Sequence, residues 1–185
     1  MKGIFQKTRS YRRFDETKKQ TREALLSIVE AARFSPSAGN MQRLRFRLVN
    51  EPEEVAYLFD QLAWAGYLKE WDGPAPGERP TSYILILTKT QPSEILGMDM
   101  GIAAQSMMLK AVSMGLGGCM LASFHKEKTE ARFAPEGYRV GLVLALGAPV
   151  ERVELEDTKD GDIHYYRLAD ETHRVPKLPL ETLVL

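Results

Sequence analysis

The alternation of apolar and polar side chains predicts three strands in the first 150 residues. Residues 43–50 alternate strictly, with leucine and phenylalanine on one face and arginine on the other, which predicts a half-buried strand. Residues 83–88 and 139–147 are continuous apolar runs. Such runs are typical of strands in the interior of a sheet, because both faces are then covered.

A helical period appears in three other segments. In residues 21–34, Thr21 suits the N-cap, and four apolar side chains recur at helical spacing on one face. Two more helices are predicted, one over residues 53–65 and one from about Asp99 to Met114, whose methionines are expected in the core.

Proline and glycine mark the breaks between these elements. Residues 35–40 ("SPSAGN") end the first helix, residues 72–80 form a loop, and residues 115–118 ("GLGG") end the long helix. Residues 119–123 are then short and extended. Strands and helices therefore interleave, without repeats or an internal linker. We expect a single α+β domain over residues 1–185, built as a three-layer sandwich.

The composition is that of an ordinary globular protein, with 44% hydrophobic and 27% charged residues. No apolar run approaches the roughly 20 residues of a membrane span, and the N-terminus lacks the apolar core of a signal peptide. A cytoplasmic protein without a membrane partner is expected. The single cysteine, Cys119, excludes an internal disulfide and is expected to be a buried small residue.

Charge is balanced over the whole chain but not along it. Lys+Arg and Asp+Glu both number 25, yet residues 1–50 hold 12 basic and 4 acidic side chains. Such asymmetry is typical of an anion site or a nucleic-acid surface. An equally good interpretation is that two faces of opposite charge pair when the chain folds or dimerises.

Familiar catalytic motifs are missing from the sequence. The "GLGG" cluster follows a helix instead of opening one after a strand, so it is not a dinucleotide fingerprint. The three histidines lack metal-ligand spacing, and no Ser-His-Asp order appears. We therefore predict no metal site, no hydrolase chemistry and no catalytic acid or base.

The arginine cluster in "TRSYRRF", residues 8–14, is the strongest chemical signal. Arg9, Arg12 and Arg13 fall within five positions, beside the hydroxyl of Ser10. Guanidinium groups bind phosphate through paired, charge-assisted hydrogen bonds, and about two such cations suffice for one phosphate. The alternative is a solvated basic turn.

Five segments, taken in order, agree with the phosphate interpretation. Arg9-Ser10-Tyr11-Arg12-Arg13-Phe14 is followed by a turn that carries Pro36, Ser37, Asn40 and Gln42. A helix of the "DMGIAAQSMMLKAVSMGLGGC" kind and an extended "MLAS" come next, and a strand closes on "LALGAP". In this order and spacing the sequence resembles the nitroreductase family of FMN-dependent oxidoreductases over most of residues 1–149.

The resemblance implies a role for each matching residue. Arg9, Ser10 and Lys177 would hold the FMN phosphate, and Arg12 would lie at the pyrimidine edge of the flavin and raise its reduction potential. The proline-serine turn would approach the flavin of the other subunit, and an extended segment would touch the flavin near N5. These two groups are Pro36, Ser37, Asn40 and Gln42 in the turn and Leu121, Ala122 and Ser123 in the extended segment.

The chain departs from the family pattern at three places. Thr8 stands where an arginine is common, and the turn continues with Arg43 and Leu44 in place of proline and tryptophan. The second tail cation is missing after Lys177, which leaves Arg174 as its candidate replacement. Arg13 is expected to face solvent or a surface carboxylate.

The resemblance implies a homodimer with FMN sites at its interface and a C-terminal tail that reaches across it. Hydride would pass from NAD(P)H through FMN to a small nitroaromatic, quinone or enone acceptor, with ping-pong kinetics. Two alternatives stay open. One is a flavin-binding protein of this fold with another role, such as FMN storage or fragmentation; the other is a nucleic-acid-binding module, which would not need the proline-serine turn.

Overall fold

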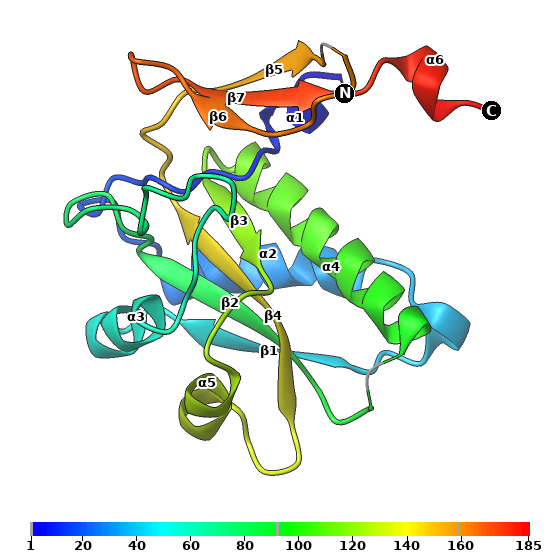
Figure 1. Ribbon diagram of the computed structural model, residues 1–185. Helices are drawn as coiled ribbons and strands as arrows, with labels where there is room; N and C mark the ends of the chain where they lie inside the picture. The colour runs from blue at the N-terminus through cyan, green and yellow to red at the C-terminus, as the bar shows by residue number, and fades with distance from the viewer. Residues whose placement is uncertain (1, 92, 159) are drawn as a thin grey trace.

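The computed structural model describes residues 2–91, 93–158 and 160–185. Its helices and strands follow one another in the order shown in Figure 1. They are α1 (Lys2–Lys7), α2 (Arg22–Arg33), the 3-10 turn η1 (Ala38–Asn40), β1 (Leu44–Val49), α3 (Pro52–Phe59), β2 (Ser82–Thr88), α4 (Glu94–Ser113), β3 (Gly117–Leu121), α5 (Lys126–Phe133), β4 (Arg139–Gly147), β5 (Val153–Asp157), β6 (Tyr166–Arg167), β7 (His173–Lys177) and α6 (Leu180–Leu183).

A four-stranded sheet with the order β1-β2-β4-β3 forms the middle of the molecule, and each neighbouring pair is antiparallel (Figure 1). Every residue of β2 is buried, and β4 is buried over its second half. These are the two apolar runs of the sequence. The structure therefore confirms that they are interior strands.

Two separate hydrophobic clusters cover the two faces of this sheet. On one face, α2 and α4 pack against alternate residues of β2 and β4, such as Ile84 and Leu144. On the other face, α3, α5 and the loop after α3 cover the intervening residues, such as Leu85 and Val143. The fold is thus the α+β three-layer sandwich that the sequence predicts.

Helix α2 begins where the sequence places it, because the Thr21 hydroxyl accepts a hydrogen bond from the Ala24 N–H at 3.2 Å. Helix α4 starts five residues earlier than predicted. Ser93 caps it by accepting from the Leu96 N–H at 3.2 Å, so Asp99 lies inside the helix. The buried Met107 and Met108 confirm that methionines of α4 fill the core.

The helix predicted over residues 53–65 is wrong beyond Phe59, where α3 ends. The chain after it pairs instead with the segment that follows β3. The Ala63 N–H donates to the Ser123 carbonyl at 3.0 Å, and the His125 N–H donates to the Gln61 carbonyl at 2.8 Å. These bonds fix the backbone on both sides of Phe124.

The sequence gives no signal for the second sheet, which has the order β5-β7-β6. Strands β5 and β7 are parallel, and β6 is antiparallel to β7. Figure 1 shows this sheet next to α1, beyond the C-terminal end of α4, with α6 projecting away from it. The C-terminal segment therefore packs on the N-terminal segment of its own chain as far as β7.

Two glycines of β3 allow close contacts that a side chain would block. A side chain at Gly117 would meet Tyr11 of the N-terminal segment at 2.6 Å, and one at Gly118 would meet the Ala145 carbonyl of β4. Ser10 forms a bridge with Gly118, whose carbonyl accepts from the Tyr11 N–H at 2.9 Å. Part of the "GLGG" cluster thus belongs to the sheet, while Gly115, with φ of +77°, follows the end of α4.

Gly118→Ala should lower the free energy of unfolding by about 1–3 kcal/mol, the usual cost of forcing an extra carbon into a packed core. Urea unfolding monitored by circular dichroism measures it. Gly66→Ala is the matched control, since nothing lies within 4 Å of the added carbon, and should change stability by less than about 0.5 kcal/mol. Equal stability of the two variants would contradict the close contact at Gly118.

Candidate functional site

A cavity of about 370 Å³ lies between the N-terminal segment, α4, β3 and the second sheet. Among the described residues, three cationic side chains line it, those of Arg9, Arg12 and Lys177, and no carboxylate does. It is therefore suited to an anion. The other lining residues are Thr8, Ser10, Gln105, Met108, Met120, Tyr165, His173 and Val175.

The two arginines that line this cavity keep buried donors without a partner among the described residues. Arg9 donates from Nη2 to the Phe5 carbonyl at 2.8 Å, and Arg12 donates from Nη1 to the Ser10 carbonyl at 3.3 Å. The Nε atoms of both arginines are buried and have no protein partner. A buried donor without an acceptor is costly, so a bound anion would complete the site.

Arg12 is held in place from three sides and is only 8% exposed. Its guanidinium carbon lies 5.0 Å from the centre of the Tyr165 ring, and its Nη1 lies 3.4 Å from His173 Nε2. Its backbone N–H donates to the carboxylate of Glu151, whose side chain is 1% exposed. Glu151 also accepts from Arg167 Nη2 at 3.4 Å.

His173 adds no charge to the cavity. Burial, together with the nearby Arg12 and Arg167, lowers its pKa to about 4. The ring is therefore neutral near pH 7, and its Nε2 can accept a hydrogen bond from Arg12. His173 thus orients a cation without repelling it.

Two other arginines lie outside the cavity. Arg13 pairs with Glu78 at 2.5 Å and with Glu171 at 2.9 Å, the surface carboxylate pairing expected for it. Arg174 pairs with Glu154 at 2.9 Å, and its Nη1 lies 3.7 Å from Glu156. The structure therefore does not bring Arg174 together with Lys177 in the cavity.

The proline-serine turn lies elsewhere on the same chain. Pro36, Ser37 and Gln42 line a different cavity of about 170 Å³, and Asn40 is exposed. The Ala38 N–H at the start of the turn donates to the buried Asp99 carboxylate of α4 at 2.8 Å. The turn is thus anchored to α4, apart from the cavity of Arg9.

The end of β3 and the two residues after it pass between two cavities. Met120 lines the cavity of Arg9, and Ala122 lines a further cavity of about 280 Å³. Leu121, between them, points into the core, and Ser123 is exposed. Successive side chains of an extended segment alternate in direction, so Met120 and Ala122 share the face that both cavities open on. Cys119 is buried, as expected, and burial raises the pKa of its thiol.

Sequence reasoning missed several residues of the first cavity. Met120 could have been found, because it lies two positions before Ala122 in an extended segment. Nothing in the sequence points to Tyr165 or His173, because only the unpredicted second sheet brings them to Arg12. Gln105, Met108 and Val175 were also missed.

Among the described residues, no helix is long and apolar enough to cross a membrane. Within the same part of the chain, no group of three or more His, Cys, Asp or Glu side chains could hold a metal ion. Both findings concern residues 2–91, 93–158 and 160–185.

Comparison with models of known protein families shows to which family this chain belongs. The model of the Nitroreductase family matches residues 6–148, which is well over half of the chain. The chain belongs to the nitroreductase family. The match contains the arginine cluster, the proline-serine turn and Ala122, and it ends before the second sheet. No curated protein sequence matches this nitroreductase family member.

Solved structures share the fold at low sequence identity. An FMN-dependent nitroreductase from Clostridium difficile R20291 is 22% identical, with a TM-score of 0.64 over 88% of this chain and 94% of its own. A nitroreductase with bound FMN from Desulfitobacterium hafniense DCB-2 is 21% identical, with a TM-score of 0.67 over 99% and 95%. A protein named as an NADH oxidase from Clostridium acetobutylicum is 25% identical, with a TM-score of 0.60 over 79% and 87%.

Proposed function

We propose that this protein is an FMN-dependent oxidoreductase that passes hydride from NAD(P)H, through bound FMN, to a small acceptor. The observation that carries the proposal is the cavity of Arg9, Arg12 and Lys177, whose described lining residues include three cations and no carboxylate. Family membership supports it, as do neighbours described as FMN-dependent, as containing bound FMN and as an NADH oxidase.

The phosphate of FMN suits this cavity. Arg9, Ser10 and Lys177 would bind it, and the unpartnered buried Nε of Arg9 would gain an acceptor. Arg174 has no part in this proposal, because its guanidinium is paired with Glu154 and lies near Glu156. Thr8 lines the cavity, but its hydroxyl donates to the Ile4 carbonyl at 2.7 Å.

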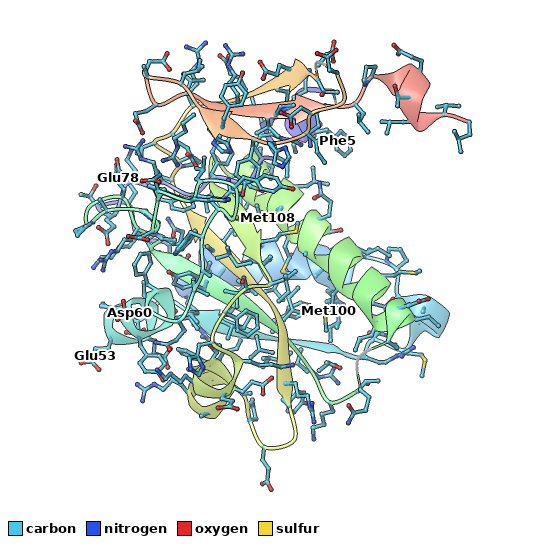
Figure 2. All side chains as sticks on the ribbon, viewed as in Figure 1. Phe5, Glu53, Asp60, Glu78, Met100 and Met108 are labelled. Atoms are coloured by element: carbon cyan, nitrogen blue, oxygen red, sulfur yellow. The ribbon has the colours of Figure 1, made fainter. Side chains whose placement is uncertain are left out.

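The flavin ring would extend from there along β3 and α4. Met100 and Met108, labelled in Figure 2, line the cavity of Ala122 and the cavity of Arg9 respectively. Met108 follows Met100 by eight residues, which corresponds to about 12 Å along α4 at the rise of an α-helix. A long cofactor with its phosphate in the cavity of Arg9 could therefore reach along Met120 to the edge of the cavity of Ala122.

The residues of the chain would bind and orient the cofactor, and FMN would supply the hydride chemistry. The backbone around Ala122 is held on both sides, because Leu121 pairs with Val143 of β4 and the Ser123 carbonyl accepts from the Ala63 N–H. Arg12 would place positive charge at the pyrimidine edge. In the overall reaction, NAD(P)H, a proton and the acceptor become NAD(P)⁺ and the reduced acceptor, without a side-chain acid.

A homodimer would complete the site. The proline-serine turn cannot contribute to the cavity of Arg9 on its own chain, because it lines a separate one. Large apolar side chains are exposed around it on α2, the turn and α4, which favours a protein interface. They are Phe34 (71% exposed), Met41 (62%), Ile95 (50%), Met98 (63%) and Ile102 (40%). The apolar residues of α6 would form a second contact, as an arm across the interface.

The FMN-loaded protein should lose its flavin absorbance at 450 nm when NADH or NADPH is added under argon, and should regain it when a quinone such as menadione follows. Anaerobic absorbance spectroscopy measures both steps. A bound flavin that neither nucleotide bleaches would contradict the reductase and favour the storage or fragmentation role. Protein that holds no flavin would refute both.

Arg9→Ala should weaken FMN binding by about 1.5–3 kcal/mol, the range for a hydrogen bond to a charged group. Arg12→Ala should weaken FMN binding less than Arg9→Ala does, but it should lower the reduction potential of bound FMN. A lost charge contact worth about 1.4 kcal/mol to the reduced flavin corresponds to a drop of about 30 mV. Fluorescence titration and a redox-dye assay measure the two effects. Arg13→Ala is the control, because Arg13 pairs with Glu78 and Glu171, and it should change neither. Equal losses for all three variants would indicate a diffuse basic patch.

Light scattering should give twice the mass of the chain for the FMN-loaded protein. Met98→Glu, which puts a charge among the exposed apolar side chains of α4, should convert it to a monomer and weaken FMN binding at the same time. Lys69→Glu, on an exposed loop, is the control. A wild-type monomer that still binds FMN would overturn the shared site.

A further inference from the structure

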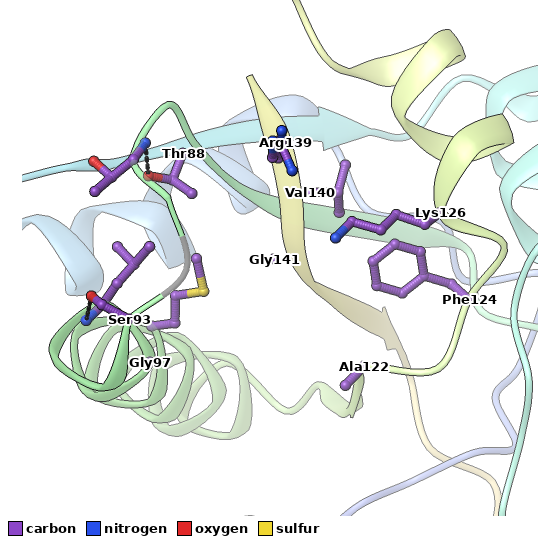
Figure 3. Close-up of a pocket in the computed structure, with 12 residues that line it drawn as sticks. Thr88, Ser93, Gly97, Ala122, Phe124, Lys126, Arg139, Val140 and Gly141 are labelled. Carbon is purple, nitrogen blue, oxygen red and sulfur yellow. Dashed lines mark hydrogen bonds between the residues drawn. The ribbon is translucent and has the colours of Figure 1, made fainter. Parts of the chain in front are cut away.

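The cavity of Ala122 is built by four parts of the chain that lie far apart in the sequence (Figure 3). The end of β2, the start of α4, the segment between β3 and α5, and the start of β4 surround about 280 Å³. Its lining residues are Thr88, Thr90, Ser93, Leu96, Gly97, Met100, Ala122, Phe124, Lys126, Arg139, Val140 and Gly141.

The walls of this cavity are largely apolar. Leu96 and Met100 come from α4, Val140 from β4, and Phe124 from the segment after β3. Phe124 is held on both sides by the backbone bonds of Ser123 and His125 to residues 61–63. The volume is just below the range of about 300–1,000 Å³ that is usual for ligand pockets, which favours a molecule with one ring.

Two cationic side chains, those of Lys126 and Arg139, line this largely apolar cavity. Figure 3 shows Lys126 extending beside the Phe124 ring toward Gly141, with Arg139 on the facing strand. Neither cation takes part in an ion pair among the described residues. The carboxylate at this edge, Glu130, accepts a hydrogen bond from the Val140 N–H at 3.0 Å.

Hydroxyl groups on the opposite side can donate to an anion. Thr88 Oγ1 already accepts from the Thr90 N–H at 3.0 Å, and Ser93 Oγ accepts from the Leu96 N–H at 3.2 Å. Because these bonds use the oxygens as acceptors, the hydroxyl hydrogens stay available. The cavity thus offers cations and hydroxyl donors around an apolar space.

We propose that this cavity binds the acceptor, and that Lys126 and Arg139 select acceptors that combine a single aromatic ring with a carboxylate. The proposal rests on the proposed function, since Ala122 is the residue at which the cavity would meet the flavin. Phe124, Leu96 and Val140 would contact the ring, while the cations bind the carboxylate. For a nitroaromatic acceptor, NAD(P)H, a proton and the nitro compound give NAD(P)⁺, the nitroso compound and water.

Matched acceptors test the selection. The FMN-loaded protein should reduce 4-nitrobenzoate with a KM about tenfold below that for the neutral 4-nitrobenzamide, as expected when one ligand gains a charge-assisted contact. The double variant Lys126→Gln with Arg139→Gln should raise the KM for 4-nitrobenzoate about tenfold and leave that for the amide unchanged. Lys128→Gln, an exposed lysine that does not line the cavity, should change neither.

A binding measurement makes the outcome independent of turnover. Calorimetry of the same protein should detect benzoate but not benzamide, and the double variant should lose benzoate binding while keeping its bound FMN. Equal KM values for the two nitro compounds, or benzoate binding that survives the double substitution, would overturn the inference. Failure of NADH or NADPH to bleach the flavin would instead refute the proposed function, and benzoate calorimetry would still decide whether the cavity binds a carboxylate.

Discussion

The close contact between the N-terminal segment and β3 determines where the charges of this protein lie. Gly117 leaves no room for a side chain beside Tyr11, and the backbone of Gly118 bridges to Ser10, so residues 10–14 pack directly against the strand. Glu151 then fixes the backbone at Arg12, and the second sheet covers its guanidinium with Tyr165 and His173. The cationic side chains of Arg9, Arg12 and Lys177 therefore gather around one cavity beside β3 and α4.

The charge asymmetry of the chain has two physical explanations, and both contribute. Some cations of the basic first 50 residues pair with acids that come later, as Arg13 does with Glu78 and Arg47 does with Glu54. Others, such as Arg9 and Arg12, face a cavity that no carboxylate lines in the part of the chain that the structure describes. Folding therefore neutralises part of the surplus and leaves the remainder where an anionic cofactor would bind.

Local pattern predicts the central sandwich well, because period and burial coincide there. The strand of residues 139–147 and the N-cap at Thr21 follow from local pattern, whereas the placing of Lys177 beside Arg9 and Ser10 was implied only by the resemblance to the family. The second sheet does not follow from local pattern, since β5 and β6 are short and polar and pair only through β7. Tyr165 and His173 were missed for that reason, and Arg174 was misplaced because its acidic partners come from β5.

The central claim is that the cavity of Arg9, Arg12 and Lys177 binds the phosphate of FMN. Comparing FMN with riboflavin tests it most directly, because the two differ only in that phosphate. Titration of the flavin-free protein should give FMN an affinity at least about 100-fold higher than riboflavin, as two charge-assisted contacts imply, and added salt should narrow the difference. Equal affinities for the two flavins, at low and high salt, would contradict the account.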